Sequence, residues 1–221
     1  MEVRLISLSK PSAVTGCSTA EELIAYAARV SNPGNQNNTL TAPKLIKYLL
    51  KNKHFSPFEM VSMTLEIVTT RDIARQILRH RSFSFQEFSQ RYADPTTDLG
   101  FEIREARLQD LKNRQNSLPA EDKELAEQWS MKQAKLLLDT RKAYEWAISS
   151  GIAKEQARAI LPEGNTVSRL YMSGTLRSWI HYCDLRMGNG TQLEHAKVAA
   201  ACWGIIEAHF PNIVEAYNEI E

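Results

Sequence analysis

The sequence predicts a single α+β domain in which a majority of helix packs around a small sheet. Three observations predict this fold class. The chain has 221 residues, close to the size of one domain of about 100–200 residues. Hydrophobic residues make up 43% of it, and helical periods alternate with short period-two runs. Because no repeat, linker or shift in composition divides the chain, we assign residues 1–221 to one domain.

The N-terminal segments predict a strand followed by two helices. Val3–Leu8 is expected to form a short strand. Ser18 and Glu21 have the spacing of a capping box, which predicts a helix over residues 18–30. A second helix is expected over residues 42–50, where apolar residues recur at helical spacing.

The pattern then changes to strand and back to helix. Apolar and polar residues alternate over 61–70, as in a half-buried strand. Residues 71–80 return to the helical period, with an apolar and an arginine-rich face. Residues 93–117 are turn-rich and are interpreted as a loop, with a strand at Phe101–Arg104.

The C-terminal half is mostly helical in pattern. Pro119 lies in the first turn of a long helix that reaches Ser149, with Ser117 as its candidate cap and Gly151 as its stop. The remaining chain is expected to form a short helix, a strand and three further helices, at Lys154–Leu161, Thr166–Met172, Gly174–Met187, Glu194–Phe210 and Pro211–Ile220.

Composition excludes several classes of protein. Lys+Arg minus Asp+Glu is 27 − 26, a net charge of +1, which argues against a nucleic-acid polymer as partner. Three widely spaced cysteines without a CxxC motif predict neither a disulfide framework nor a zinc site, and no metal is expected. No signal peptide or run of about 20 apolar residues is present, so we expect a cytoplasmic protein without a membrane segment.

The densest chemical segment runs from Arg79 to Tyr92. Between Arg71 and Arg91, five arginines face only two acidic residues, which suits a small anionic ligand gripped by guanidinium groups. The arginines of the 71–80 helix could equally form a solvated face. Three consecutive residues, Arg79 to Arg81, cannot share one face, so either the helix ends there or some of these groups are buried with partners. Ser84 and Glu87 also fit a capping box, a structural alternative.

The predicted helix 174–187 carries a second set of candidates. Leu176, Ile180, Cys183 and Met187 form an apolar stripe, so Cys183 is interpreted as a core residue. Arg186 lies near the helix C-terminus, where the helix dipole alone explains a cation. Its role therefore stays open between structure and function at this point.

Five sequence blocks together carry a resemblance. Arg79, His80 and Arg81, then seven residues, then Ser89 resemble the RHR-x7-S signature of the flavin-dependent thymidylate synthases. Blocks at 27–31, 54–59, 155–158 and 176–186 resemble the same family in the same order. The resemblance implies methylation of dUMP to dTMP, with methylenetetrahydrofolate as carbon donor and an FAD hydride supplied by NADPH. It also implies a homotetramer with FAD where subunits meet; contacts through Trp179, Tyr182 or helix 194–210 would fit it.

The resemblance implies roles for individual residues. The FAD-binding positions would be Ser56, Arg79, His80, Arg81, Glu87, Thr175, Leu176, Arg177 and His181. The dUMP-binding positions would be Gln76, Ile77, Leu78, Arg79, Glu87, Phe88, Ser89, Gln90, Arg91, Arg158 and Arg186. Arg186 matches the arginine said to favour ionisation of the uracil ring and is the candidate catalytic residue. Ser89 has no neighbouring base and is assigned to binding.

Two other functions compete with this interpretation. One is a non-catalytic module that stacks RNA bases or nucleotides on the arginines and aromatics of residues 79–92. The other is a metal-free phosphohydrolase with His80 as catalytic group, which lacks a clear acid partner.

Overall fold

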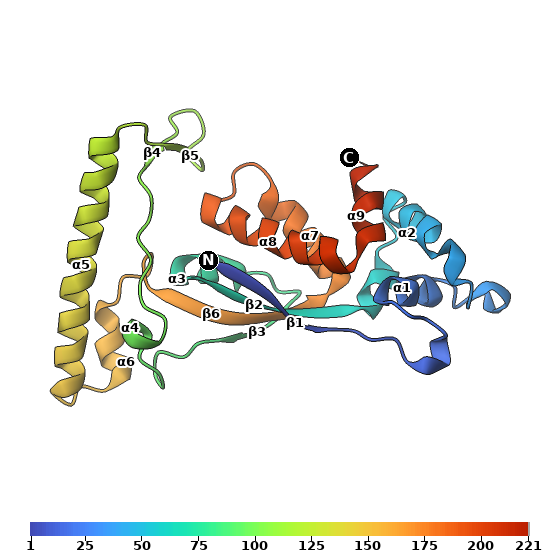
Figure 1. The fold of residues 1–221 in the computed structure, drawn as a ribbon, viewed down its shortest axis with the longest axis horizontal. Coiled ribbons are helices and arrows are strands. Elements are labelled where there is room, and N and C mark those ends of the chain that lie inside the picture. The colour runs from blue at the N-terminus through green and yellow to red at the C-terminus, as the bar shows by residue number, and fades with distance from the viewer. Residues whose placement is uncertain (221) are drawn as a thin grey trace.

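A four-stranded antiparallel sheet forms the centre of the protein, in a computed structural model that describes residues 1–220 (Figure 1). The strand order is β1 (Glu2–Leu8), β2 (Ser62–Thr70), β6 (Val167–Thr175) and β3 (Ser84–Glu87). Helices account for 52% of the chain. The α+β fold with a majority of helix is therefore confirmed.

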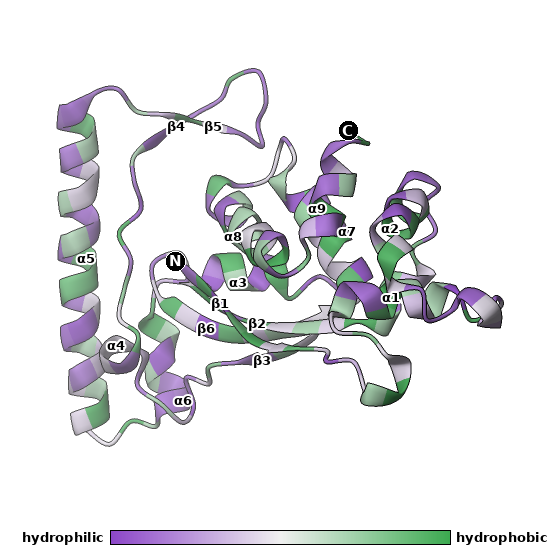
Figure 2. Ribbon diagram, turned by 45° about the vertical axis from the view of Figure 1, so that its right-hand side comes forward, coloured by the Kyte–Doolittle hydropathy of each residue, from purple (hydrophilic) through white to green (hydrophobic). Residues whose placement is uncertain are grey.

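Three helices cover one face of this sheet. They are α3 (Arg71–Ile77), α7 (Leu176–Met187) and α8 (Leu193–His209), all above the strands in Figures 1 and 2. The ladder between β2 and β6 runs the whole length of both strands, from Ser62↔Thr175 to Thr70↔Val167. Because β6 continues directly into α7, this ladder fixes where α7 begins.

The main core lies between β2 and these helices. Leu65 and Ile67 of β2 are completely buried, as are Trp179 and Cys183 of α7. The Trp179 indole N–H donates to the carbonyl of Met63 at 3.0 Å, which satisfies the one polar atom of this large side chain. Cys183 is thus a core residue, as predicted, whereas Met187 at the end of the predicted stripe is 38% exposed.

This burial corrects one expectation about assembly. Trp179 is 0% exposed and Tyr182 1% exposed within their own chain. They therefore cannot supply contacts between subunits. Both residues pack inside the core because α7 lies on the sheet, side by side with α8.

Two helices near the N-terminus, α1 (Ala20–Ala28) and α2 (Ala42–Lys51), pack against each other. The capping box of α1 is formed by Thr19 and Glu22, one residue later than predicted. The reason is that Glu21 is used elsewhere: its carboxylate accepts from the Ile213 backbone N–H at 3.0 Å, at the start of α9 (Pro211–Asn218).

The longest helix, α5 (Lys123–Ser149), stands away from the sheet (Figure 1). Its cap is Asp122, whose carboxylate accepts from the backbone N–H groups of Glu124 and Leu125 at 2.9 and 3.1 Å. The predicted cap, Ser117, is wrong, since it lies in the small hairpin of β4 (Arg107–Gln109) and β5 (Ser117–Pro119). The strand predicted at Phe101–Arg104 is also wrong: it is reduced to a bridge from Phe101 to Thr166.

Several other boundaries differ from the prediction. The helix predicted over 71–80 ends at Ile77, and Ser84 and Glu87 pair with β6 instead of forming a capping box. Gly174 and Thr175 belong to β6, and Thr175 caps α7. The remaining short elements are α4 (Pro95–Asp98), α6 (Lys154–Ala157) and 3-10 turns at Ala13–Thr15, Pro33–Asn35, Thr39–Thr41, Ser56–Met60 and Arg158–Ile160.

Gly174 allows a close approach that a side chain would block. A Cβ at this position would lie 2.7 Å from Cε1 of Phe83, whose ring packs against Trp179 with centroids 4.8 Å apart. We expect Gly174→Ala to lower the free energy of unfolding by about 1–3 kcal/mol, because overpacking forces the ring out. Gly204→Ala in α8, with nothing within 4 Å of its Cβ, should raise it by about 0.5–1 kcal/mol. Equal urea midpoints for the two variants would contradict this account.

Candidate active site

The loop that follows α3 lies against the first turn of α7. Ser178 Oγ donates to the carbonyl of Ser82 at 3.4 Å, and Phe83 packs on Trp179. This contact places Arg79 and Arg81 beside α7. Both arginine side chains are exposed and have no hydrogen-bond or ion-pair partner among residues 1–220.

Arg186 is held by a neutral histidine from this loop. Its Nε–H donates to Nε2 of His80 at 2.9 Å, and an imidazole nitrogen that accepts cannot carry a proton. Burial, with the charges of Arg186 and Arg79, lowers the pKa of His80 to about 4. The four terminal N–H donors of Arg186 have no partner in the described chain. Arg186 is therefore anchored at one end with its fork left open.

The depressed pKa of His80 makes stability depend on pH. An unfolded histidine has a pKa near 6.5, so between about pH 6.5 and 4 the unfolded state binds a proton that folded His80 does not. Stability is then fully present above this window and lost as the pH falls through it. We expect the urea midpoint of wild type to fall more steeply from pH 6.5 to 4 than that of His80→Gln. Parallel curves for the two proteins would contradict the assignment.

The predicted FAD-binding residues of α7 differ in their accessibility. Arg177 pairs with Glu59, and His181 packs on Phe55 with ring centroids 4.5 Å apart. Thr175 accepts the Ser178 N–H as helix cap. Leu176 is completely buried, so its side chain packs in the core and only its backbone can face a ligand. The same holds for Ile77 of the dUMP set.

Glu87 lies at the end of β3 in a cluster of charges. Its carboxylate accepts from Ser168 at 2.8 Å and lies 3.4 Å from Arg71 and 3.5 Å from Arg75. Arg71 is only 8% exposed, so the arginine-rich side of α3 is partly paired and buried and is not a fully solvated face. Glu87 thus has structural partners of its own in this chain.

The segment after β3 is held by α6. Arg91 pairs with Glu155 at 3.1 Å, and Lys154 donates to the carbonyl of Tyr92 at 3.0 Å. Ser89 Oγ accepts only the Arg91 N–H at 3.4 Å among the described residues, with no base beside it. This geometry fits a binding role.

Two donors in this region lack partners. Gln90 is 5% exposed, and its Nε2 is buried without a hydrogen bond within residues 1–220. Arg158 is exposed and its guanidinium has no partner in the same part of the chain. A buried polar atom left unpaired is costly, so Gln90 points to a missing acceptor.

Twelve of the predicted site residues form two groups. The α7 group contains Gln76, Arg79, His80, Arg81, Arg177, His181 and Arg186. The α6 group contains Phe88, Ser89, Gln90, Arg91 and Arg158. In Figures 1 and 2 α7 lies above the sheet, whereas α6 lies beyond the end of β6, beside α5. Among residues 1–220 no hydrogen bond or ion pair joins the two groups.

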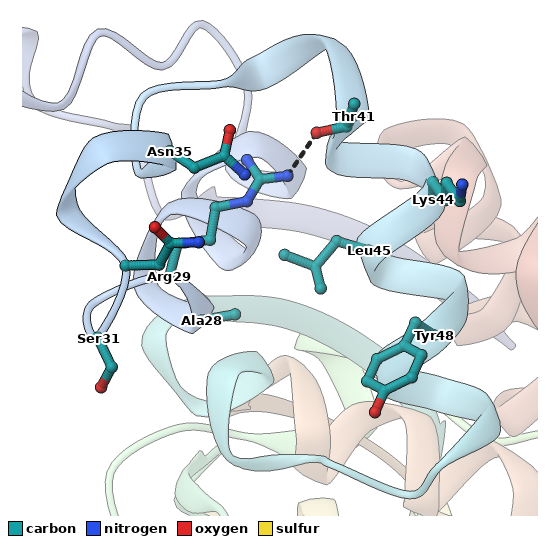
Figure 3. Close-up of a pocket in the computed structure, with 9 residues that line it drawn as sticks. Ala28, Arg29, Ser31, Asn35, Thr41, Lys44, Leu45 and Tyr48 are labelled. Carbon is teal, nitrogen blue, oxygen red and sulfur yellow. Dashed lines mark hydrogen bonds between the residues drawn. The ribbon is translucent and has the colours of Figure 1, made fainter.

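The block at 27–31 lines a separate hollow between α1 and α2 (Figure 3). This pocket of about 470 Å³ contains Ala28, Ser31, Leu45 and Tyr48. The Arg29 guanidinium crosses it to donate to Thr41 Oγ1 at 2.7 Å. The structure thus gives Arg29 a role in joining the two helices, and does not bring it to the α7 group.

Sequence reasoning missed His195. It is completely buried on α8 and contacts Gln76 and Tyr182. A lone histidine in an alanine-rich helix gives no motif. Its contact with Gln76 and its packing beside His80, with ring centroids 6.3 Å apart, connect it with the site.

Comparison with known proteins identifies the family. The family model described as thymidylate synthase complementing protein matches residues 14–212. A probable flavin-dependent thymidylate synthase of Paramecium bursaria Chlorella virus 1 is 53% identical over 99% of both chains. The chain belongs to the flavin-dependent thymidylate synthases. The enzyme of this name from Synechocystis is 51% identical over 98% of this chain and 99% of its own.

Solved structures agree with this family. A UMP/dUMP methylase, PolB from Streptomyces cacaoi bound with 5-Br dUMP, is 27% identical with a TM-score of 0.83. The match covers 99% of this chain and 94% of that one. Membership in a family of flavin-dependent thymidylate synthases favours neither a non-catalytic RNA-binding module nor a phosphohydrolase built on His80.

The α7 group fits the flavin that this family requires. A reduced flavin is anionic, and the two unpartnered arginines of the 78–83 loop would provide compensating charge, whereas Arg177 on α7 already pairs with Glu59. No group of three or more His, Cys, Asp or Glu side chains within residues 1–220 is arranged to hold a metal ion. None of the helices in that range is long and apolar enough to cross a membrane.

Proposed function

We propose that this flavin-dependent thymidylate synthase methylates dUMP to dTMP, with methylenetetrahydrofolate as carbon donor and NADPH as reductant of bound FAD. One observation carries the proposal: Arg186 is bonded to neutral His80 through Nε and keeps its terminal donors open, and the loop that carries His80 also carries two unpartnered arginines, Arg79 and Arg81. The Streptomyces methylase supports a uracil nucleotide as substrate, since its structure contains 5-Br dUMP.

Arg186 provides the electrostatic contribution to the reaction. Transfer of a one-carbon unit to carbon 5 of uracil requires electron density at that carbon, and negative charge along the ring edge supplies it. A guanidinium remains protonated at any working pH, so Arg186 stabilises that charge without acting as a base. His80 holds the Nε of Arg186 in place. Because the imidazole is neutral, it does not neutralise the positive charge of Arg186.

The α6 group suits the nucleotide phosphate. Gln90 offers a buried N–H without an acceptor, and Arg158 an exposed guanidinium without a partner. Arg91 would share its charge between Glu155 and the ligand. Phosphate binding by arginine forks and amide donors is favourable because these bonds are charge-assisted. FAD, when bound, supplies the hydride that reduces the transferred carbon.

We infer that two copies of the chain complete each site within a homotetramer. The α7 group lies over one face of the sheet, whereas α6 lies beyond the end of β6 beside α5, and no hydrogen bond or ion pair among residues 1–220 joins the two groups. This separation is the reason for assigning the two groups of one site to different chains. Exposed apolar side chains of α5 support association, since Trp129 is 43%, Leu136 54% and Trp146 64% exposed. Large exposed apolar side chains on one helix are typical of an interaction surface.

Subunit mixing tests the shared site. Arg158→Ala and Arg186→Ala should each be nearly inactive alone. If one chain supplies the α6 group and another the α7 group, mixed tetramers contain some sites with both arginines. We therefore expect dTMP formation to reappear when the two variants are unfolded and refolded together. Sites contained within one chain would leave the mixture as inactive as its parts.

Cofactor content tests the proposal itself. Purified protein should be yellow and release FAD on denaturation, and added dUMP should change the flavin absorbance. A colourless protein that also refuses added FAD would overturn the proposal and favour the nucleotide-binding module.

A further inference from the structure

His195 is a completely buried histidine with both ring nitrogens in use. Nδ1 lies 3.2 Å from Oε1 of Gln76, and Nε2 lies 3.1 Å from the hydroxyl of Tyr182. Burial, with the charges of Arg186 and His80, lowers its pKa to about 3. The ring is thus neutral and carries one N–H, and the position of that proton decides the direction of both hydrogen bonds.

A carboxylate at the other end of the network fixes the direction. Glu194 pairs with Arg104 at 3.0 Å. Burial raises the pKa of Glu194, but hydrogen bonds and the charge of Arg104 outweigh it and leave the pKa lowered. An ionised carboxylate only accepts. Gln192 must therefore turn its amide nitrogen to Glu194, at 2.9 Å.

The remaining bonds follow in sequence. With its nitrogen committed, Gln192 offers its oxygen, which accepts from Nε2 of Gln76 at 2.7 Å. The oxygen of Gln76 then faces His195, so Nδ1 must be the protonated nitrogen. Nε2 is left to accept the hydroxyl proton of Tyr182. A reversed Gln76 amide would oppose the oxygens of Gln76 and Gln192 and lose that hydrogen bond. His195 would also have to move its proton from Nδ1 to Nε2 to keep the bond to Gln76.

We propose that His195, Gln192 and Glu194 are positioning residues that fix the amide of Gln76 in one orientation for binding dUMP. The inference rests on the proposed function, because Gln76 is a dUMP residue only by resemblance. With one N–H and one oxygen lone pair of Gln76 occupied by the network, one N–H and one lone pair stay available, each on a defined side. The ligand then meets a prearranged donor and acceptor, which avoids the cost of ordering them on binding.

A purely structural role for His195 predicts something different. A histidine that only fills the core would, on removal, lower stability without acting through Gln76. A double-mutant cycle separates the two roles, since an effect transmitted through Gln76 disappears when Gln76 is absent. An asparagine amide can place an N–H near the position of Nδ1, so His195→Asn should preserve the orientation that His195→Leu loses.

The experiment measures the dissociation constant of dUMP with wild type, His195→Leu and His195→Asn, each with and without Gln76→Ala. We expect His195→Leu to weaken dUMP binding about tenfold, near the upper end for one neutral hydrogen bond. His195→Asn should stay within about threefold of wild type on the same scale. In the Gln76→Ala background His195→Leu should add less than about twofold. Bound FAD should be unchanged throughout.

A second variant keeps the test valid if His195→Leu does not fold. Gln192 is exposed, so Gln192→Ala should fold and also weaken dUMP binding only when Gln76 is present. Failure of wild type to bind dUMP would overturn the proposed function, and this inference with it. Normal binding by wild type, with equal effects of the His195 or Gln192 variants in both backgrounds, would overturn the inference alone.

Discussion

Arg186→Ala should keep the fold and the FAD but lose dTMP formation by a factor of at least about 100, the usual cost of removing one electrostatic contact to developing negative charge. The reason is the open fork of the guanidinium. Its Nε is held by His80 at 2.9 Å, and its terminal donors have no other partner within residues 1–220. The measurement is turnover per bound FAD on preparations with known melting temperature.

Arg186→Lys provides the matched control. An ammonium restores the charge but not the planar fork, so part of the turnover should return. The alternative is that Arg186 only stabilises the C-terminus of α7 through the helix dipole, although it donates to no terminal carbonyl of α7 in the described chain. Arg186→Ala would then lower the melting temperature slightly and leave turnover per folded protein unchanged. That outcome would discard the catalytic assignment.

Arg81→Ala should weaken FAD binding far more than it weakens folding. A hydrogen bond to a charged group contributes about 1.5–3 kcal/mol, so the dissociation constant of FAD should rise roughly 10- to 150-fold. Arg81 is exposed and has no partner in the described residues, so the free energy of unfolding without FAD should change by less than about 0.5 kcal/mol. Fluorescence titration of FAD and urea unfolding of the apoprotein measure the two quantities.

Arg114→Ala is the control for this change. Arg114 is another exposed arginine whose guanidinium has no partner in residues 1–220, and it lies in the turn between β4 and β5. Its removal should leave FAD binding unaltered. Equal losses in both variants would show a general charge effect, and an Arg81→Ala protein that unfolds easily yet holds FAD normally would refute the assignment.

The periodic parts of the fold could be predicted from the sequence. Apolar and polar residues alternate over 61–67, and the structure places residues 62–70 in β2, paired along its whole length with β6. Boundaries failed where a tertiary contact decided them. Glu21 accepts the Ile213 N–H at the start of α9, so the capping box of α1 is formed by Thr19 and Glu22 and not by Ser18 and Glu21. Four residues from Ser84 gave no clear alternation and formed β3 only because β6 offered an edge.

The site could be predicted in part for a similar reason. Consecutive residues such as Arg79 to Arg81 form a motif that can be recognised along the chain. The bond between His80 and Arg186 joins residues 106 positions apart, and no local pattern encodes it. His195 was missed because its partners, Gln76 and Tyr182, come from two other helices. The separation of the α6 and α7 groups likewise becomes visible only when both are placed on the sheet.

Direct product analysis tests the central claim. The purified protein with bound FAD is incubated with dUMP, methylenetetrahydrofolate and NADPH. The nucleotides are then separated, and their masses are measured by mass spectrometry. The account predicts dTMP, heavier than dUMP by one CH₂ group, only when all three co-substrates are present, and its loss in Arg186→Ala. Unchanged dUMP from a folded, FAD-loaded enzyme would contradict it.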